Sequence, residues 1–205
     1  MFIIQARELS KKYQTQRIFD NFSATFEQGR KYAIIGPNGS GKSTLLKTLS
    51  NYSSADKGKL QYLKQGRVIQ DYSIFTHISY AAPYVNLFRE FTVAETLHWV
   101  KQSKGLTKEV KDILEITQLH TAKHKYVKYL SSGMYQRLKL AAAIFTIYDV
   151  LFLDEPCTNL DQASIQLYQE WIHSHTDSKI VIIASNQLHE YQMCDTILDM
   201  LNYKL

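Results

Sequence analysis

The chain has 205 residues, of which 45% are hydrophobic, so it can build one sizeable core in a single domain or a domain with a lobe. The formal net charge is +5, but Lys and Arg are scattered, which argues against a nucleic-acid-binding stripe. Two cysteines are too few for a disulfide framework and favour an intracellular location. The start lacks a signal-peptide pattern, and no apolar run approaches the ~18 residues of a membrane span, so we expect any membrane role to need a partner.

The first part of the chain reads as strands with one early helix. Alternating or continuous apolar residues predict strands at residues 2–9, 19–26, 31–35, within 53–69, and at 78–83. Turn residues separate these runs, and a helix is expected from Lys42 to Leu49.

The remainder reads as a helical segment followed by buried strands. From about residue 85 to residue 140, apolar residues recur at the i, i+3, i+4 spacing of amphipathic helices. The apolar runs at 150–153 and 179–184 are typical of parallel strands covered on both faces, and a helix is expected between them at 161–175. We therefore predict one α/β domain over residues 1–205, with a core at about 1–83 and 141–205 and a helical lobe at about 84–140.

The strongest motif is a phosphate-binding loop. The stretch "GPNGSGKST" matches G-x-x-x-x-G-K-[ST] and stands between a predicted strand and a predicted helix. Its glycines let successive backbone N–H groups point at phosphate oxygens. Lys42 is expected to reach the β and γ phosphates, and the Ser43 hydroxyl to ligate Mg²⁺. The predicted nucleotide-binding residues of this loop are Gly36, Pro37, Asn38, Gly39, Ser40, Gly41, Lys42, Ser43 and Thr44.

A second motif, "DVLFLDEP", carries two acids at the end of a predicted strand. The carboxyl ends of parallel strands are where α/β sheets bind ligands. Asp154 is expected to hold Mg²⁺ directly or through water, and Glu155 to polarise a water toward the γ-phosphate. Together the two motifs indicate a nucleoside triphosphatase.

The stretch "YLSSGMYQRLKLAAAIF" predicts a helix with a small, polar start, which exposes backbone N–H groups to an anion. Its "LSSGM" closely resembles the LSGGQ signature of ATP-binding-cassette (ABC) proteins. Leu130, Ser131 and Gly133 match that signature, while Ser132 and Met134 depart from it. Ser131 is also suited to be a plain helix N-cap, and a capped helix start can still bind an anion, so the two roles are compatible.

The resemblance to ABC proteins extends over nearly the whole chain. Tyr13 stands where the family has an aromatic residue that stacks on adenine, and Asp161 in "EPCTNLD" matches the acidic position of the D-loop. The resemblance implies a P-loop fold of ABC type: a mixed or parallel core sheet, N-terminal antiparallel strands and an inserted helical lobe. It also implies an ATPase that uses ATP and Mg²⁺.

The resemblance further implies partners. In this family two domains pair head to tail, so that each signature faces the other chain's ATP. The partner would be a second copy or a related ABC subunit. A separate integral membrane subunit would place the chain at the cytoplasmic face of a membrane. The transported substrate, the direction of transport and the choice between homodimer and heterodimer stay open.

Two positions depart from the family. Pro83 stands where a Gln usually contacts Mg²⁺, and proline offers no such ligand. Asn186 stands where a His usually contacts the γ-phosphate; an amide can donate a hydrogen bond but carries no charge. We expect an ATPase with Asn186 as a γ-phosphate donor, and whether the two changes slow turnover stays open. The alternative for Asn186 is a cap on the segment that follows it.

Other interpretations remain open at this stage. The chain could be a non-transport ABC ATPase, for example in iron–sulfur assembly, or a slow ATP-sensing module. His120 and His124 have helical i, i+4 spacing but no accompanying carboxylate motif, so a surface pair is favoured over a metal site. Cys157 is expected in the core or a loop. For one apolar set two interpretations stay open, lobe core and the docking site of a membrane subunit: Tyr84, Val85, Leu87, Phe88 and Phe91.

Overall fold

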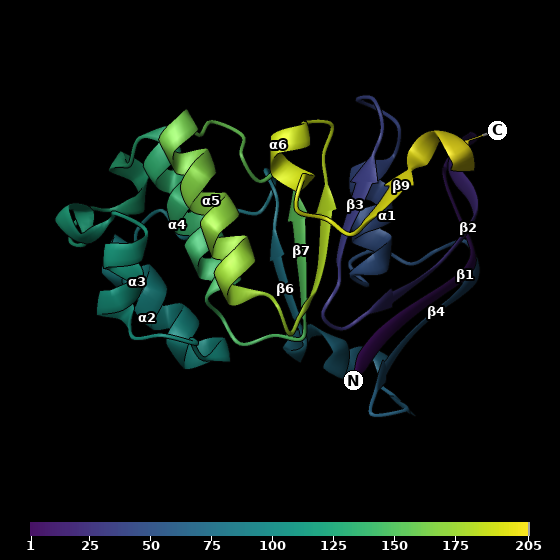
Figure 1. The fold of residues 1–205 in the computed structure, drawn as a ribbon, viewed down its shortest axis with the longest axis horizontal. Helices are drawn as coiled ribbons and strands as arrows, with labels where there is room; N and C mark the ends of the chain where they lie inside the picture. Colours follow the sequence, from purple (N-terminus) through teal and green to yellow (C-terminus); the bar gives the residue numbers. More distant parts are fainter. Residues whose placement is uncertain (205) are drawn as a thin grey trace.

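A parallel five-stranded sheet forms the centre of the molecule, in the computed structural model that describes residues 1–204. Its strand order is β6-β7-β8-β3-β9, and every neighbouring pair is parallel. The strands are β3 (Lys31–Ile35), β6 (Ile78–Ala81), β7 (Val150–Asp154), β8 (Ile180–Ala184) and β9 (Thr196–Asp199). Figure 1 shows this sheet between a helical part on one side and an antiparallel sheet on the other.

The central strands are apolar throughout because both of their faces are covered. Side chains alternate between the faces, so Leu151 and Leu153 pack in one core while Val150 and Phe152 pack in the other. The first core is completed by the helices α4 (Ser132–Ile144) and α5 (Gln162–His175).

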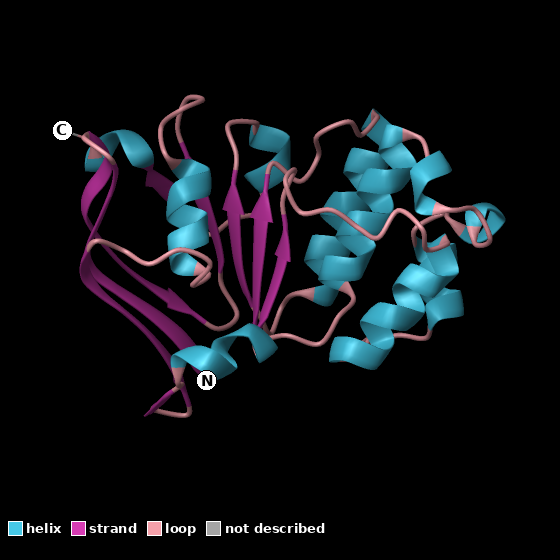
Figure 2. Cartoon of the chain, turned by 180° about the vertical axis from the view of Figure 1, so that it is seen from behind, coloured by secondary structure: helices cyan, strands magenta, loops and turns pink. Residues whose placement is uncertain are grey.

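The second core lies under the antiparallel sheet. That sheet has the order β2-β1-β4-β5 and comprises β1 (Phe2–Tyr13), β2 (Gln16–Glu27), β4 (Lys57–Lys64) and β5 (Arg67–Val68). Helix α1 (Lys42–Leu49) lies between the two sheets and buries Leu45, Leu46 and Leu49 there (Figures 1 and 2). The helix that follows the P-loop is therefore anchored on both sides.

The helical lobe contains α2 (Val93–Lys104) and α3 (Val110–Ile116), with α4 connecting it to the sheet. Thr92 and Glu95 form a capping box that starts α2. The shorter elements are the 3₁₀ helices η1 (Asp71–Thr76), η2 (His120–Ala122), η3 (Val127–Tyr129) and η4 (Met200–Tyr203), and the helix α6 (Leu188–Tyr191). Helix α4 crosses the lobe boundary expected at residue 140, because its C-terminal half packs on the central sheet.

The fold class expected from the sequence is confirmed, with differences in detail that include the following. Strand β9 was not predicted, since Thr196–Asp199 is short and only partly buried. Strand β6 ends at Ala81 rather than Pro83. The helical spacing assumed for His120 and His124 is wrong, because His120 opens a three-residue 3₁₀ helix that ends at Ala122.

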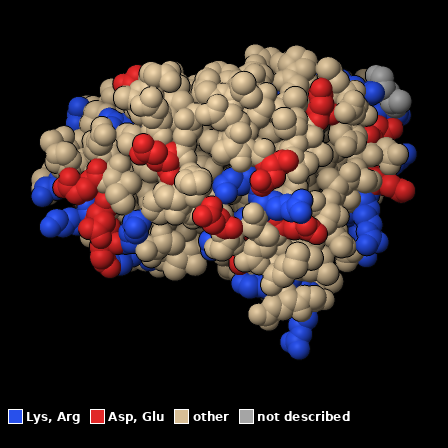
Figure 3. Space-filling view, in the orientation of Figure 1, with Lys and Arg blue, Asp and Glu red and all other residues tan. Residues whose placement is uncertain are grey.

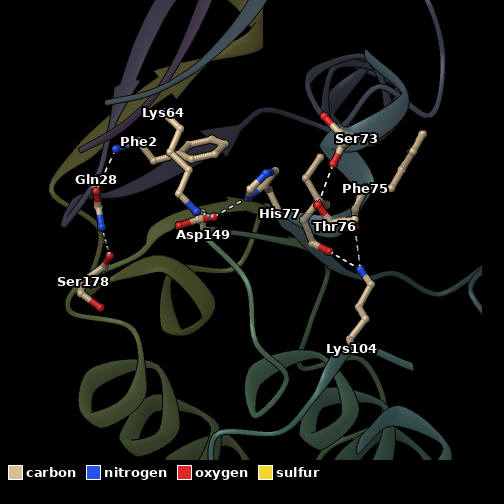
Figure 4. Close-up of polar contacts among 11 residues, drawn as sticks. Phe2, Gln28, Lys64, Ser73, Phe75, Thr76, His77, Lys104, Asp149 and Ser178 are labelled. Atoms are coloured by element: carbon tan, nitrogen blue, oxygen red, sulfur yellow. Dashed lines mark hydrogen bonds and ion pairs between the residues drawn. The ribbon is translucent and has the colours of Figure 1, made fainter. Parts of the chain in front are cut away.

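Side-chain contacts tie the parts of the core together (Figure 4). Asp149 Oδ2 accepts hydrogen bonds from Lys64 Nζ of the antiparallel sheet at 2.9 Å and from His77 Nδ1 at 2.6 Å. Lys104 at the end of α2 donates to the carbonyls of Phe75 and Ile78, and burial lowers the pKa of its ammonium group. The lobe is thus held to the segment that enters β6.

The face seen in Figure 3 has acidic and basic side chains interspersed, without a stripe of one sign. Within residues 1–204, no helix has the length and apolar character needed to cross a membrane.

Candidate nucleotide site

The P-loop joins β3 to α1 and leaves the start of the helix open. Gly41 is the N-cap with φ +100°, and no side chain caps the first turn. A Cβ at this position would lie 2.6 Å from Ile18 Cγ2, so both the backbone angle and the space require glycine. The first N–H groups of α1 therefore remain available to an anion.

Lys42 is folded back over the loop. Its Nζ donates to the carbonyl oxygens of Gly36 at 2.8 Å and Pro37 at 3.2 Å, and the side chain is buried. A buried ammonium group placed among backbone carbonyls provides the positive charge that phosphate oxygens need.

The loop borders a pocket of about 380 Å³. Tyr13, from the end of β1, and Glu155, from the end of β7, line it together with P-loop residues. The lining residues are Tyr13, Ile18, Asn38, Gly39, Ser40, Gly41, Lys42, Ser43, Thr44 and Glu155. Ile18 was not among the predicted binding residues; its apolar side chain gives no sequence signal for this role.

The two predicted metal ligands contact each other, and Ser43 lines the pocket while Asp154 lies behind it. Ser43 Oγ donates to Asp154 Oδ1 at 3.0 Å, although 111 residues separate the two in sequence. Asp154 is 2% exposed, and burial is the main reason that the pKa of its carboxyl is raised. Its Oδ2 has no hydrogen-bond partner among residues 1–204. A buried carboxylate oxygen that accepts no hydrogen bond is free to bind a cation. Together with the neighbouring hydroxyl it provides the oxygen ligands that Mg²⁺ prefers.

Glu155 stands at a strained turn beyond β7. Its φ is +45°, and its backbone N–H donates to the carbonyl of Ala184 at 2.9 Å. Non-glycine residues rarely adopt such a conformation, which is common at functional sites. The turn directs a half-buried carboxylate into the pocket rather than along the strand.

Asn186, beyond β8, reaches the P-loop. Its Nδ2 donates to Asn38 Oδ1 at 3.2 Å. The alternative in which Asn186 caps the following helix is wrong: the N-cap of α6 is Gln187. The local side-chain acceptor is instead Ser185, whose Oγ accepts from the Gln187 N–H at 2.9 Å.

The signature segment lies apart from this pocket. None of Leu130, Ser131, Ser132, Gly133 and Met134 lines it. Ser131 is exposed and is the N-cap of α4, with its Oγ accepting from the Met134 N–H at 3.3 Å. The N-cap role is therefore confirmed.

The D-loop packs against the start of the signature helix. A Cβ at Gly133 would lie 3.5 Å from the carbonyl oxygen of Asn159. Asp161 is the N-cap of α5, and its Oδ1 accepts from the Ser164 N–H at 2.8 Å. The carboxylate predicted for the D-loop thus has a local capping role in this chain.

Tyr84 is a residue that sequence reasoning placed only in an apolar set. Pro83 is exposed and does not line the nucleotide pocket, whereas the Tyr84 hydroxyl bonds to that of Tyr80. Lys47 Nζ lies 3.9 Å from the centre of the Tyr84 ring. Burial and then Asp154 are among the causes that raise the pKa of the Tyr84 phenol. The sequence feature that could have pointed to Tyr84 is its position directly after Pro83.

Comparisons with known proteins show the family of the chain. The family model described as "ABC transporter" matches residues 19–158. The chain belongs to the ABC transporter ATP-binding family. The ABC transporter ATP-binding protein YcbN of Bacillus subtilis is 32% identical over 203 residues, covering 96% of this chain and 66% of YcbN. The sulfate/thiosulfate import ATP-binding protein CysA of Vibrio cholerae is 29% identical, covering 98% of this chain and 57% of CysA. This ABC domain thus spans less than two thirds of the length of these relatives.

Solved structures give the same result for the fold. The structure of an ABC transporter ATP-binding protein from Pyrococcus furiosus has a TM-score of 0.83 and 25% identity, covering 99% of this chain and all of that chain. A bacterial Atm1-family ABC exporter with ATP bound also has a TM-score of 0.83, at 20% identity, over 97% of this chain and 37% of the exporter. The chain therefore has the fold of an ABC ATPase domain.

Proposed function

We propose that this ABC domain hydrolyses ATP with Mg²⁺ and drives a transporter through a separate membrane subunit. The observation that supports it best is the 3.0 Å hydrogen bond between Ser43 and Asp154, which unites the P-loop with the end of β7. Glu155 lines the same pocket as the P-loop, and Asp154 contacts that pocket's wall through Ser43.

Each residue of the proposed site has a role that follows from its chemistry. Lys42 and the N–H groups of the P-loop bind the phosphates, and Tyr13 stacks on adenine. Ser43 and Asp154 hold the Mg²⁺ ion, which when bound neutralises charge on the β and γ phosphates. Glu155 accepts a proton from the attacking water, and Asn186 donates a hydrogen bond to the γ-phosphate.

A second ABC domain completes the site in this proposal. The signature start, Ser131 to Met134, combines an exposed helix N-terminus with distance from its own chain's pocket. An exposed N-terminus that its own nucleotide does not use is suited to a γ-phosphate bound by a partner in a head-to-tail pair. The partner is a second copy or a related ABC subunit.

The membrane subunit docks in an apolar groove of about 660 Å³ between the lobe and the core. Its wall includes Phe88 and Trp99, which are 51% and 46% exposed. Of the apolar set considered from the sequence, Tyr84 and Phe88 are exposed, while Val85, Leu87 and Phe91 are half-buried. Exposed aromatic rings around a groove are typical of a protein–protein contact. This contact would hold the domain at the cytoplasmic face of the membrane.

Pull-down of the tagged full chain from detergent-solubilised native membranes tests this function. We expect an integral membrane protein to co-purify with the wild type and to be lost with Trp99→Glu. Val68→Glu, on the exposed strand β5, is the matched control and should retain it. Recovery of only a soluble scaffold would favour a non-transport ABC ATPase, for example in iron–sulfur assembly. Nucleotide binding without turnover would favour an ATP-sensing module.

A further inference from the structure

Behind the nucleotide pocket, the loop after β7 faces the short helix after β8. Cys157 comes from the loop, and His189 and Glu190 come from α6. Their ligand atoms (one sulfur, one imidazole nitrogen and one carboxylate oxygen) all lie within 4.8 Å of one another. We propose that these three residues form a binding site for one divalent cation of the Zn²⁺ class.

The spacing is close to that of the ligands of a single ion. Zn²⁺ binds sulfur at about 2.3 Å and nitrogen or oxygen at about 2.0–2.2 Å, so two of its ligands at the tetrahedral angle are about 3.5 Å apart. The observed upper limit of 4.8 Å is about 1.3 Å wider than this, so the side chains move inward when the ion binds. Three protein ligands leave a fourth tetrahedral position for water.

Glu190 is already held in place for this role. It is 1% exposed, and its Oε1 accepts from the Cys157 N–H at 2.7 Å. Its Oε2 accepts from the Ser185 hydroxyl. A carboxylate has about four lone-pair sites, so two hydrogen bonds leave capacity for a metal. Such supporting bonds orient a ligand before the ion arrives.

The backbone of α6 is fixed as well. Tyr168 Oη donates to the carbonyl of Glu190 at 3.0 Å, and Gln169 Nε2 donates to that of His189 at 2.7 Å. Both donors belong to α5. The metal donors therefore stand on a short helix that is hydrogen-bonded to a longer one, rather than on a free loop.

The donor types select for a borderline-soft cation. A thiolate and an imidazole favour Zn²⁺ over Mg²⁺, which prefers oxygen ligands only. Burial, followed by the nearby Glu190 carboxylate, raises the pKa of the Cys157 thiol. Because a metal binds the thiolate, cation binding here releases the thiol proton to solvent. Half-buried His189 leaves one side of the site open to an arriving ion.

The site differs from the one expected for Mg²⁺, since neither Ser43 nor Asp154 belongs to it. Its residues are close in sequence to residues of the proposed nucleotide site. Cys157 is in the loop that carries Glu155, and His189 follows Asn186 in the segment after β8. An ion bound by Cys157 and His189 would join these two segments.

Zn²⁺ titration of the nucleotide-free full chain against a chromophoric chelator tests the proposal. We expect one Zn²⁺ per chain, with affinity lowered at least about a hundredfold by Cys157→Ser and by His189→Ala, because loss of a direct ligand should exceed the 10–100-fold cost of a supporting one. Cys194→Ser and His173→Ala, which change a thiol and an imidazole outside the cluster, should bind like the wild type.

A second measurement does not depend on the folding of Cys157→Ser or His189→Ala. Co²⁺ added to the wild type and to Cys194→Ser should produce a thiolate-to-cobalt charge-transfer absorption. Zn²⁺ affinity unchanged in folded Cys157→Ser, or no thiolate absorption with Co²⁺ in the wild type, would overturn the site.

Discussion

Asn186 donates a hydrogen bond to Asn38 of the P-loop, with 3.2 Å between Nδ2 and Oδ1, across 148 residues of sequence. The contact places a neutral donor at the rim of the nucleotide pocket, which Asn38 lines. Asn186 is not the N-cap of α6, which is Gln187. The relationship supports the proposed role at the γ-phosphate.

We therefore expect Asn186→Ala to lower turnover more than nucleotide binding. Loss of a neutral hydrogen bond worth about 1.4 kcal/mol in the transition state corresponds to about tenfold in rate. Asn186→His should be tolerated, since imidazole also donates. Steady-state ATPase rates and thermal melts are the measurements. A lower melting temperature with an unchanged rate per folded molecule would contradict the phosphate-donor role.

Lys42→Ala should nearly abolish ATP binding. The substitution removes the buried ammonium group and both of its hydrogen bonds to the P-loop carbonyls. Calorimetric titration with ATP measures the loss. Lys204→Ala is the matched control: Lys204 also contacts the loop, at the Gly39 carbonyl, but from an exposed position, and should keep near-normal affinity. An unchanged affinity of Lys42→Ala for ATP would contradict the P-loop assignment.

Glu155→Gln should bind ATP normally and hydrolyse it slowly. The amide has the shape of the carboxylate but cannot accept the proton from water. An ATP-bound head-to-tail dimer should then accumulate, which light scattering detects. A sample that stays monomeric with ATP bound would count against the paired arrangement. Adding the co-purified membrane subunit repeats the test at a higher local concentration of the ABC domain.

Ser131→Arg should leave ATP binding by the monomer intact while blocking turnover, because the bulky side chain obstructs a partner's γ-phosphate. It also removes the N-cap contact with Met134, worth about 1 kcal/mol. Ser131→Ala removes the cap alone and is the matched control, with a lower melting temperature and a smaller loss of rate. If Ser131→Arg instead loses ATP binding as a monomer, the residue belongs to its own chain's site.

Asp149 should contribute to stability in a pH-dependent way. Burial alone would raise its pKa, but hydrogen bonds from Lys64 and His77 lower it below the usual value. A carboxyl with a lowered folded-state pKa stabilises the fold above its unfolded pKa of about 3.9, and this is lost as pH falls through the folded value. Urea unfolding should show Asp149→Asn less stable than wild type at pH 7, with a smaller difference under strong acid. Asp177→Asn, which breaks an ion pair whose carboxylate is 76% exposed, should have little effect at either pH.

The sequence predicted the elements whose signals are local. The P-loop was predicted because phosphate binding there uses consecutive backbone groups, and the strand–loop–helix context was also readable. Strands β7 and β8 were recognised as buried parallel strands because covering both faces demands continuous apolar residues. The signature helix start and its Ser131 cap followed from local capping chemistry.

Other features were decided by how distant segments come together. Strand β9 has no strong local pattern and is defined by its pairing with β3. His120 and His124 have a helical spacing, but the segment folds as a short 3₁₀ turn. In both cases tertiary contacts decided the local conformation.

By itself the sequence determined the family, the P-loop and the acidic end of β7, since each is a contiguous run whose chemistry depends on near neighbours. Only the tertiary structure decided which side chains face one another. The register of the parallel strands brings Asp154 to Ser43, and the turns after β7 and β8 bring Cys157 to Glu190 and Asn186 to the P-loop. Such pairs depend on the path of the backbone between them, and no spacing in the sequence encodes that distance.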